Sequence, residues 1–367
     1  MRVLFSKPHL DAAELDLVLR LHSMGVFIRV LASPRTLGRQ ELAARGLFIE
    51  AAAIKGKIQP RLISQMRRLI RELDLSIIHA TDSASLSNAL FASLFTSVDV
   101  VGYRGTLSRI RRFDPTYWLG ILNPRVRKIF CVSESVRDHL APFINPSRLV
   151  VNPKGFSCEW LSANTSALEL PSRTRLSAVF IGNARGRPYK GLDSLIQAFH
   201  IANHPECSLV IAGDYDDHIP ALVADGPASE RIHLLGQQGG AASMLPSADI
   251  YIQPSLREGL PRSVKEAMGA GLPIIATDIP GNTDLVEHGR SGLLVPPSSP
   301  EHMAAALLKM CDSAKLRSQL GEAARERLKT RFSPARYALK TFQVYEEIQN
   351  SRQRPPRTVK PAPGSAR

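Results

Sequence analysis

Two glutamates stand eight positions apart in the stretch SLREGLPRSVKEAMGAGLP (255–273), on either side of a Gly-Leu-Pro turn. Pro261 suits the first position of a helix because its missing N–H would be unpaired there. The following RSVKEAMGA predicts a helix that the glycines near its end can terminate. Glu258 would then lie in the loop before this helix and Glu266 about one and a half turns into it. Such a helix N-terminus can bind an anion, although two solvated acids on a surface loop are an open alternative.

A second group of chemically useful residues lies in AVFIGNARGRPYKGLDSLIQAFHIA (178–202). The pattern predicts a strand, a loop rich in Gly, Arg and Lys, and a helix from about Leu192. Arg185 and Lys190 bracket the loop, with Arg187 between them, so the loop can bind phosphate beside a helix N-terminus. It is not a P-loop, and no GxGxxG follows the first strand, so the chain gives no indication of a nicotinamide site. A solvated basic turn would look similar.

Short apolar runs alternate with amphipathic stretches along the chain, which indicates parallel sheets covered by helices on both faces. The runs that predict buried strands are 2–5, 26–32, 75–80, 98–103, 128–133, 176–182, 207–213, 231–236, 249–254, 272–278 and 291–296. The alternation pauses at the polar segment 162–175, which we interpret as a linker. Ligands of such sheets bind at the carboxyl ends of the strands, and the cleft between two domains is their natural site.

The expected α/β architecture is therefore two tandem Rossmann-like, doubly wound domains that face an interdomain cleft. We place the first domain at 1–160 and the second at 172–332. A helix at 333–350, which begins with a Ser-Pro start signal, is expected to cross back to the first domain. The tail at 351–367 is basic and rich in proline, so we predict that it is disordered.

The composition favours a globular cytoplasmic protein. Hydrophobic residues make up 44% of the 367 positions, and the most apolar stretch, at 83–98, is too short and too polar to span a bilayer. The start of the chain lacks a core of signal-peptide length. The four cysteines lie far apart without a CxxC pair, so neither a disulfide framework nor a zinc site is indicated, and we expect reduced thiols.

The formal net charge of +14 is concentrated in the first half of the chain, where residues 1–150 carry 22 Lys and Arg against 12 Asp and Glu. This imbalance indicates an anionic partner. The segment 61–75 predicts a helix with one apolar face and four arginines around it, and 104–120 combines four arginines with three aromatic residues. Each segment suits an anionic membrane surface. For the helix, packing on the sheet with a charged outer side is the alternative, and no nucleic-acid motif is present.

Taken together, these segments resemble the retaining nucleotide-sugar glycosyltransferases of the GT-B fold, family 4, also called glycosyl transferases group 1. The matching residues run continuously from 254 to 297 and contain the Glu-x7-Glu segment and the following G-x-x-GLLVPP-like turn. Arg185 and Lys190, followed by Gly191, match the Arg and Lys of the diphosphate site in this family. The resemblance covers nearly all of 176–347. In 1–150 it rests on the strand pattern and on CVSESVRDHL.

The resemblance implies roles for the cationic loop and for the turn before the predicted helix. Arg185 and Lys190 would hold the donor diphosphate and stabilise its growing negative charge, in place of the metal that other glycosyltransferases use. We therefore expect no metal and no cofactor. The N–H groups near Gly259 and Leu260, in the turn that Pro261 closes, would add to this stabilisation with the helix dipole behind them.

The same resemblance assigns the two carboxylates. Glu258 would contact the hydroxyl groups of the donor sugar and help to stabilise an oxocarbenium-like state, which makes it the expected catalytic residue. Glu266 would accept hydrogen bonds from the ribose hydroxyls. Gly236 matches the place where the nucleotide base packs in this family. The acids after Asp214 could suggest a metal, but no matching cluster of ligands accompanies them.

Two departures from the family pattern concern the first domain. The first loop reads KPHLDA instead of a glycine-rich sequence, and VVGYRGTLSR (100–109) carries Arg104 where the family often has a histidine. Arg104 could contact the acceptor or the sugar, or be a surface ion-pair partner. His79 we interpret as a core or loop histidine. Asp82 could face the acceptor, with a turn cap as the alternative.

The sequence thus predicts a metal-independent retaining glycosyltransferase that uses a nucleotide-sugar donor. We expect a glycan or lipid-linked glycan acceptor, as in the biosynthesis of cell-envelope polysaccharide or lipopolysaccharide. The expected location is the cytoplasm, with peripheral attachment to the inner face of the membrane through the basic first domain, and no nucleic-acid partner. Two alternatives are a sugar-nucleotide epimerase of the same architecture, which lacks this Glu-Gly-Leu-Pro…Glu spacing, and a non-catalytic sugar-nucleotide-binding protein.

Overall fold

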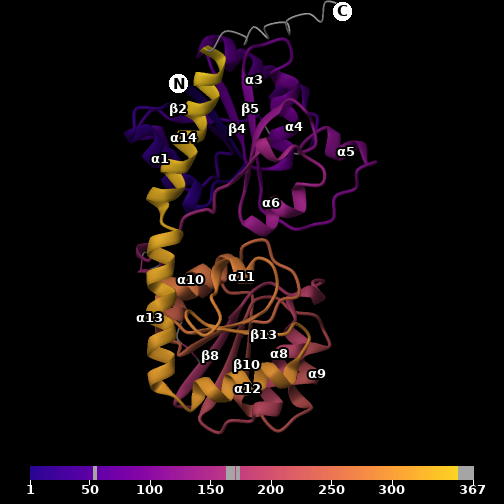
Figure 1. The fold of residues 1–367 in the computed structure, drawn as a ribbon, viewed down its shortest axis with the longest axis vertical. Coiled ribbons are helices and arrows are strands. Elements are labelled where there is room, and N and C mark those ends of the chain that lie inside the picture. The colour runs from indigo at the N-terminus through magenta and orange to yellow at the C-terminus, as the bar shows by residue number, and fades with distance from the viewer. Residues whose placement is uncertain (53–55, 163–169, 171–173, 354–367) are drawn as a thin grey trace, which may run out of the picture. The chain divides into compact units, whose positions relative to one another are not determined.

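The computed structural model describes residues 1–52, 56–162, 170 and 174–353 (Figure 1). These residues form two compact units. The first unit contains residues 1–102, 112–129 and the described residues from Ala338 onward, and the second contains 103–111 and 130–337. Most of the expected linker at 162–175 and of the expected tail at 351–367 falls outside the described residues. The domain bounds inferred from the sequence remain predictions.

The first sheet has seven parallel strands in the order β3-β2-β1-β4-β5-β6-β7. The strands are β1 (Arg2–Ser6), β2 (Phe27–Ala32), β3 (Phe48–Glu50), β4 (Ile77–Ala80), β5 (Asp99–Arg104), β6 (Val126–Cys131) and β7 (Leu149–Val151). The central strand β4 is buried along its whole length. Near-continuous apolar runs are what a parallel sheet with both faces covered requires.

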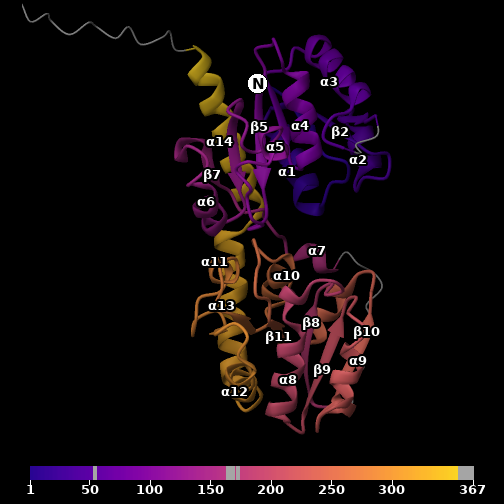
Figure 2. The same ribbon diagram turned by 90° about the vertical axis from the view of Figure 1, so that its right-hand side faces the viewer.

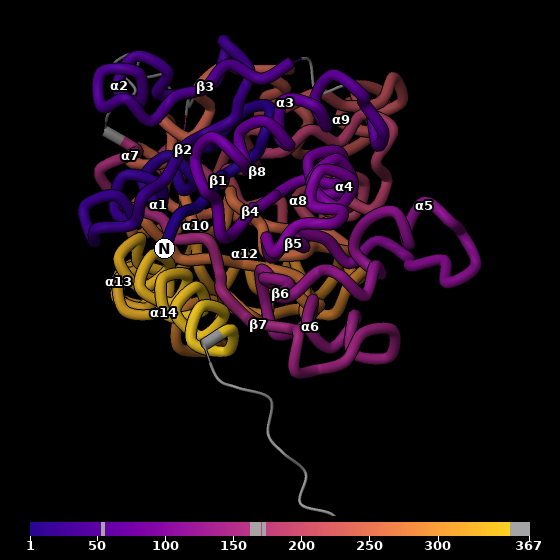
Figure 3. Tube along the Cα trace, turned by 90° about the horizontal axis from the view of Figure 1, so that it is seen from above, coloured from indigo at the N-terminus to yellow at the C-terminus, as the bar shows by residue number. Residues whose placement is uncertain are grey.

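The helices of this part of the chain begin at clear sequence signals. They are α1 (Ala12–Ser23), α2 (Arg39–Ala44), α3 (Pro60–Glu72), α4 (Ser83–Ala92), α5 (Pro115–Trp118), α6 (Glu134–Leu140), α7 (Glu159–Ser162) and the C-terminal α14 (Pro334–Gln353). Asp11 caps α1 in a capping box with Glu14, and Pro60 stands at the first position of α3. Helix α3 packs along α4 in the first unit (Figures 2 and 3).

The second sheet has six parallel strands in the order β10-β9-β8-β11-β12-β13. Its strands are β8 (Leu176–Ile181), β9 (Cys207–Ala212), β10 (Ile232–Gly236), β11 (Ile250–Gln253), β12 (Ile274–Thr277) and β13 (Leu293–Val295). The helices are α8 (Leu192–Ala202), α9 (Ile219–Ala224), α10 (Arg262–Ala270), α11 (Asn282–Leu285), α12 (Pro300–Cys311) and α13 (Ala314–Arg331). Short 3-10 helices precede α8, at Pro188–Lys190, and β11, at Ala241–Ser247.

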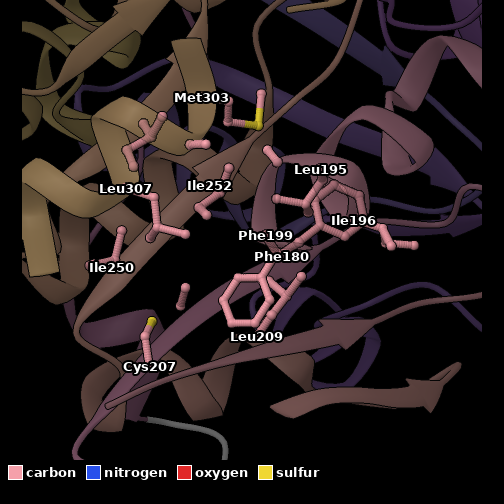
Figure 4. Close-up of a cluster of buried hydrophobic side chains, with 14 of the residues drawn as sticks. Phe180, Leu195, Ile196, Phe199, Cys207, Leu209, Ile250, Ile252, Met303 and Leu307 are labelled. Atoms are coloured by element: carbon pink, nitrogen blue, oxygen red, sulfur yellow. The ribbon is translucent and has the colours of Figure 1, made fainter. Parts of the chain in front are cut away.

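One hydrophobic core fills the space between this second sheet and the helices α8 and α12. Phe180, Ile196, Phe199 and Leu307 lie in it, together with Ile250 and Ile252 of β11 (Figure 4). Helices α8 and α12 pack against each other over the sheet. This arrangement fixes the carboxyl ends of β8 and β11, from which the loops of the candidate site emerge.

The eleven strands expected from the sequence are all confirmed, with ends that shift by up to two residues. The sequence reading missed β3 and β7, each of which has three residues and lies at an edge of the first sheet. The expected start of α10 was wrong by one position, because Pro261 is the N-cap, with an extended backbone, and the helix begins at Arg262. Of the two glycines expected to end it, Gly271 does so with φ +79°, whereas Gly269 lies inside the helix.

Among the described residues, no helix is both long enough and apolar enough to cross a membrane.

Candidate functional site

The loop between β11 and α10 places Glu258 where the sequence expects it. Gly259, Leu260 and Pro261 follow it and lead into the first turn of α10. The turn is tightly packed, because a Cβ on Gly259 would overlap the carbonyl oxygen of Gly105. Ser133 donates a hydrogen bond to the Gly259 carbonyl oxygen over 3.0 Å. Only glycine therefore allows the chain to pass here.

The loop between β8 and α8 places Lys190 against this turn. Gly191 has φ +71°, and a Cβ there would overlap the carbonyl oxygen of Pro254. Glycine is therefore required where the two loops pack against each other. The Leu256 N–H donates to the Tyr189 carbonyl oxygen over 2.6 Å. These contacts fix the cationic loop to the start of the glutamate segment, two parts of the chain that lie about 65 residues apart.

Lys190 and Glu258 form an ion pair with 2.7 Å between Nζ and Oε1. Their side chains are 18% and 12% exposed, so water screens the pair only in part. The same oxygen of Glu258 accepts hydrogen bonds from Ser255 Oγ over 2.9 Å and from Gln253 Nε2 over 3.1 Å. Three donors therefore converge on one carboxylate oxygen.

A cavity of roughly 630 Å³ opens beside this ion pair and is lined entirely by residues of the second unit. It is lined by residues of both loops and of α10: Lys190, Glu258, the turn 259–261, Arg262, Ser263, Glu266, Ile181, the segment 240–242, Gly105 and Thr106. Ligand pockets for small molecules are of this size. The N-terminal N–H groups of α10 and the positive end of its dipole lie at the cavity wall.

Glu266 lies in this lining, as expected, and is held by a second cation. Arg262 Nε is 2.8 Å from Glu266 Oε1, one helical turn away. Burial raises the pKa of the Glu266 carboxyl above its ordinary value, and the charge of Arg262 opposes that rise. Arg262 is itself 69% exposed on its side chain. A cation in the first turn is repelled by the positive end of the helix dipole, so Arg262 is stabilised by a negatively charged partner, either Glu266 or a bound anion.

Arg185 does not line the cavity. Its Nε is 3.0 Å from Asp214 and one terminal nitrogen is 3.3 Å from Asp217, and the hydrogen bond that Arg185 donates to Asp214 raises the pKa of the guanidinium. The neighbouring Gly186 N–H donates to Asp216 over 2.8 Å. The segment 214–217, which we call the acid loop, therefore accepts the hydrogen bonds that Arg185 and Gly186 donate from the loop between β8 and α8, the cationic loop.

The remaining residues singled out from the sequence lie elsewhere. Arg104 donates hydrogen bonds to the carbonyl oxygens of Thr106 and Ser108, so its guanidinium helps to hold its own loop. Asp82 is the N-cap of α4 and accepts from the N–H groups of Ala84 and Ser85, which confirms the capping alternative.

Two further residues differ in how they relate to the site. Gly236 ends β10 with φ +65°, and it is the segment 240–242, not Gly236, that lines the cavity. His79 is fully buried, with Nδ1 2.6 Å from the Tyr345 hydroxyl group in the first unit, which confirms the core-histidine interpretation.

Several residues of the site were not singled out from the sequence. Gln253 and Ser255 contact Glu258, and Arg262 contacts Glu266. A glutamine in the otherwise apolar strand DIYIQP was a usable signal, because a buried polar side chain needs partners. No such signal pointed to Thr106, which reaches the cavity through tertiary packing. Within the described residues, no group of three or more His, Cys, Asp or Glu is placed to hold a metal ion.

Comparison with known proteins identifies the class. Residues 174–327 match the family model described as glycosyl transferases group 1, and residues 15–160 match the model described as Glycosyltransferase Family 4. The two parallel sheets have the GT-B architecture of solved glycosyltransferase structures. Within that class, the chain belongs to family 4, the group 1 glycosyltransferases.

The similar proteins act in the assembly of different glycoconjugates. A phosphatidyl-myo-inositol mannosyltransferase from Mycobacterium leprae is 26% identical, over 90% of this chain and 91% of the relative. The lipopolysaccharide core biosynthesis glycosyltransferase LpsD of Rhizobium meliloti is 25% identical, over 87% and 89%. The amylovoran biosynthesis glycosyltransferase AmsK of Erwinia amylovora is 29% identical over 52% of this chain, and the match spans about half (47%) of that relative.

Solved structures share the fold at lower identity. A sucrose-phosphate synthase from Thermosynechococcus elongatus has a TM-score of 0.76 and 17% identity, and the match covers 96% of this chain and all (100%) of that one. Anabaena HepE in complex with UDP has a TM-score of 0.75 and 17% identity, with 95% and 100% covered. Both likenesses establish the fold.

Proposed function

We propose that the protein is a metal-independent, retaining glycosyltransferase that moves a sugar from a nucleotide-sugar donor to a glycan or lipid-linked glycan. The observation that carries this proposal is the Lys190–Glu258 ion pair at the wall of the cavity beside the N-terminus of α10. One side chain can neutralise a diphosphate and the other can contact a sugar. Lys190 and Glu258 lie within hydrogen-bonding distance of each other. Such a pair can contact the diphosphate and the sugar on the two sides of the bond that joins them in a nucleotide sugar.

The donor diphosphate binds between Lys190 and the N–H groups at the start of α10. Arg185 contributes once its guanidinium exchanges the carboxylates of the acid loop for a phosphate, which an Arg can contact with two N–H groups. Glu266 accepts hydrogen bonds from the ribose hydroxyls in place of Arg262. UDP is the first nucleotide to test, because the HepE structure contains it.

Transfer proceeds as the bond between the anomeric carbon and the diphosphate oxygen breaks. Lys190 and the helix N-terminus stabilise the negative charge that grows on the departing oxygen. Glu258 stabilises the positive charge on the sugar ring. The acceptor hydroxyl forms the new bond on the same face of the sugar and gives its proton to the departing phosphate oxygen. No general-base pair is needed, and the configuration at the anomeric carbon is retained.

The acceptor belongs to the cell envelope in this proposal. The relatives support that assignment, since their names include lipopolysaccharide core and phosphatidyl-myo-inositol products, and one Escherichia coli relative acts on a GlcNAc-diphosphoundecaprenol. An acceptor of this kind is presented at a membrane surface. The reaction then takes place in the cytoplasm, on the inner face of the membrane.

A surface of the first unit fits anionic lipid, and we name it the basic aromatic face. Helix α3 buries Leu62, Met66, Leu69 and Ile70 against the unit and leaves its arginines exposed. Phe113 is almost completely exposed, and Trp118 is 46% exposed. Lys57, just before α3, donates to the Thr116 carbonyl oxygen in α5, so the aromatic segment lies next to the helix. Arginines beside exposed aromatic rings suit a lipid headgroup region.

The first experiment is a thermal-shift panel with UDP, GDP, ADP, CMP and their common sugars in the presence of a metal chelator. Saturating ligand should stabilise the protein by about 2.7 kcal/mol at one hundred times its dissociation constant. A shift with one nucleotide names the donor class. A Glu258→Gln variant that binds the nucleotide at least as tightly as wild type and loses transfer supports the catalytic role, whereas unchanged transfer overturns it. Turnover of the nucleotide sugar without acceptor into an epimer would favour the epimerase alternative.

Membrane attachment is tested with vesicles of phosphatidylcholine, with and without phosphatidylglycerol. The variant Arg61→Glu/Arg71→Glu should lose anionic-vesicle binding, because each arginine contributes about 1 kcal/mol near such a surface. The matched control is Arg20→Glu/Arg45→Glu on α1 and α2, which makes the same change in charge away from the basic aromatic face. Equal losses in both variants would contradict this docking surface.

A further inference from the structure

The central strand β11 has two chemically different faces. Ile250 and Ile252 point into the hydrophobic core of the second unit (Figure 4). Tyr251 and Gln253 alternate with them, and both are almost completely buried. Side chains at alternate positions of a strand share a face, and Ser255 continues this polar row just beyond the strand. The row leads to Glu258.

The hydrogen bonds of Gln253 fix the direction of its amide group. Its Oε1 accepts from the Tyr251 hydroxyl over 2.8 Å and from Ser263 Oγ over 3.2 Å. Its Nε2 therefore points the other way and donates to Ser255 Oγ over 2.8 Å and to Glu258 Oε1 over 3.1 Å. Burial raises the pKa of the Tyr251 phenol far above its ordinary value. Tyr251 thus stays protonated and remains a donor.

The same network distinguishes the two oxygens of Glu258. Oε1 accepts from Lys190, Ser255 and Gln253. Oε2 receives no hydrogen bond from the residues that the structure describes, and Glu258 lines the cavity. Oε2 is therefore the oxygen available to a ligand. When a diphosphate draws Lys190 away, Gln253 and Ser255 become the main donors to Oε1.

We propose that Gln253 is a positioning residue which, anchored by Tyr251, holds Glu258 Oε1 so that Oε2 faces the donor sugar during transfer. This inference rests on the proposed glycosyltransferase function. Gln253 touches neither the donor nor the acceptor. It acts through the orientation of Glu258, so its loss should affect the chemical step more than nucleotide binding, since a displacement of about 1 Å at a reacting group can cost ~100-fold in rate.

A purely structural role makes a different prediction. Gln253 is 1% exposed, and replacing its buried amide by an apolar group removes the 2.8 Å partner of the Tyr251 hydroxyl and one of the two partners of Ser255 Oγ. If that were the whole effect, the variant would lose stability while the folded protein kept its catalytic constants. Stability and catalysis must therefore be measured separately.

The central experiment compares Gln253→Leu with wild type on the nucleotide sugar selected by the thermal-shift panel. We expect kcat to fall by about 10- to 100-fold, while the dissociation constant of the nucleoside diphosphate changes by less than about threefold, because Lys190 and the helix N-terminus are untouched. Tyr251→Phe, which removes only the anchor, should lower kcat less. The double variant should be no worse than Gln253→Leu alone, since both changes act through one amide. An unchanged kcat in folded Gln253→Leu overturns the proposal.

Gln253→Glu gives a second test that needs no donor. It places a carboxylate about 3 Å from Glu258, and two such groups cannot both ionise easily. Its melting temperature should therefore fall further below that of wild type at about pH 8 than at about pH 5. A pH-independent difference would show that the two side chains do not face each other in solution, and it overturns the proposal even where Gln253→Leu does not fold.

The outcomes separate this inference from the proposed function. If Glu258→Gln retains full transfer, the catalytic role of Glu258 fails and the inference fails with it. If Glu258→Gln is inactive while Gln253→Leu is fully active, only the inference fails. The matched control is Gln319→Leu, which makes the same substitution at an exposed position of α13 in the second unit, outside the lining of the cavity. It should leave kcat unchanged.

Discussion

Replacing Glu258 with glutamine is expected to tighten the binding of UDP even though it abolishes transfer. Lys190 is paired with Glu258, so a diphosphate that binds Lys190 must compete with a carboxylate already in place. Glutamine has nearly the same shape but no charge. It removes both the competitor and the repulsion between the carboxylate and the diphosphate.

The geometry of the pair sets the size of this effect. Two unit charges 2.7 Å apart attract each other by about 6 kcal/mol at an effective dielectric constant of about 20. Desolvation cancels much of that attraction for a largely buried pair, and a hydrogen bond to a charged group contributes about 1.5–3 kcal/mol net. Since Lys190 can keep part of its contact with Glu258 in the complex, we expect a gain of about 1–2 kcal/mol, or about 5- to 30-fold in Kd.

Isothermal titration of UDP into both proteins, with a chelator present, measures this gain. Glu266→Gln is the matched control, because it neutralises a second carboxylate of the same cavity whose expected partner is the ribose. That variant should bind UDP more weakly, so the two substitutions have opposite signs. A folded Glu258→Gln protein that binds UDP no more tightly than wild type would refute the idea that Lys190 exchanges Glu258 for the diphosphate.

Three further outcomes follow from the site. Lys190→Met should weaken UDP binding more than Arg185→Met, because Lys190 lines the cavity whereas the Arg185 guanidinium is already paired with two carboxylates. Isothermal titration of UDP into both variants measures the two losses of affinity. A larger loss for Arg185→Met would contradict this geometry. Burial raises the pKa of Glu266, so the wild-type protein loses stability as the pH rises from the ordinary pKa of a glutamate through the raised pKa of this one. Glu266→Gln should therefore melt at a higher temperature than wild type at neutral pH, and this difference should disappear near pH 4. A difference in melting temperature that does not change with pH would count against this burial effect. Gly259→Ala should lower the free energy of unfolding by about 1–3 kcal/mol, because the added methyl group overlaps a backbone carbonyl oxygen. Gly239→Ala is the control, since its methyl group meets no atom within 4 Å, and it should leave the free energy of unfolding in urea nearly unchanged. Equal losses in the two variants would disprove the packing argument.

The sequence predicted most of the fold because its signals are local. Buried parallel strands are continuous apolar runs, and each of the longer strands was recognisable from its own residues. The strands β3 and β7 escaped because three half-buried residues at the edge of a sheet carry too little pattern. Their formation depends on the neighbouring strand, which is tertiary information.

The candidate site was predicted only in part, for a related reason. Residue types and spacing indicated Lys190, Glu258 and Glu266, and the structure brings these three to one cavity. Arg185 matched the same pattern, yet its guanidinium lies with the acid loop. No local rule relates it to carboxylates about 30 positions later. Gln253 was visible as a polar residue in a strand, but its contact with Glu258 depends on how the chain turns after Pro254.

The acid loop has a consequence for how the protein responds to ionic strength. A protein with a net charge of +14 would ordinarily lose affinity for an anionic ligand steeply as salt is added. Here the carboxylates of Asp214 and Asp217 compete with that ligand for Arg185, and salt weakens this internal competition as well as the attraction to the diphosphate. The two effects oppose each other. The arginine and its acidic partners thus act against the loss of affinity, so binding of the diphosphate should fall less steeply with added salt than the net charge alone predicts.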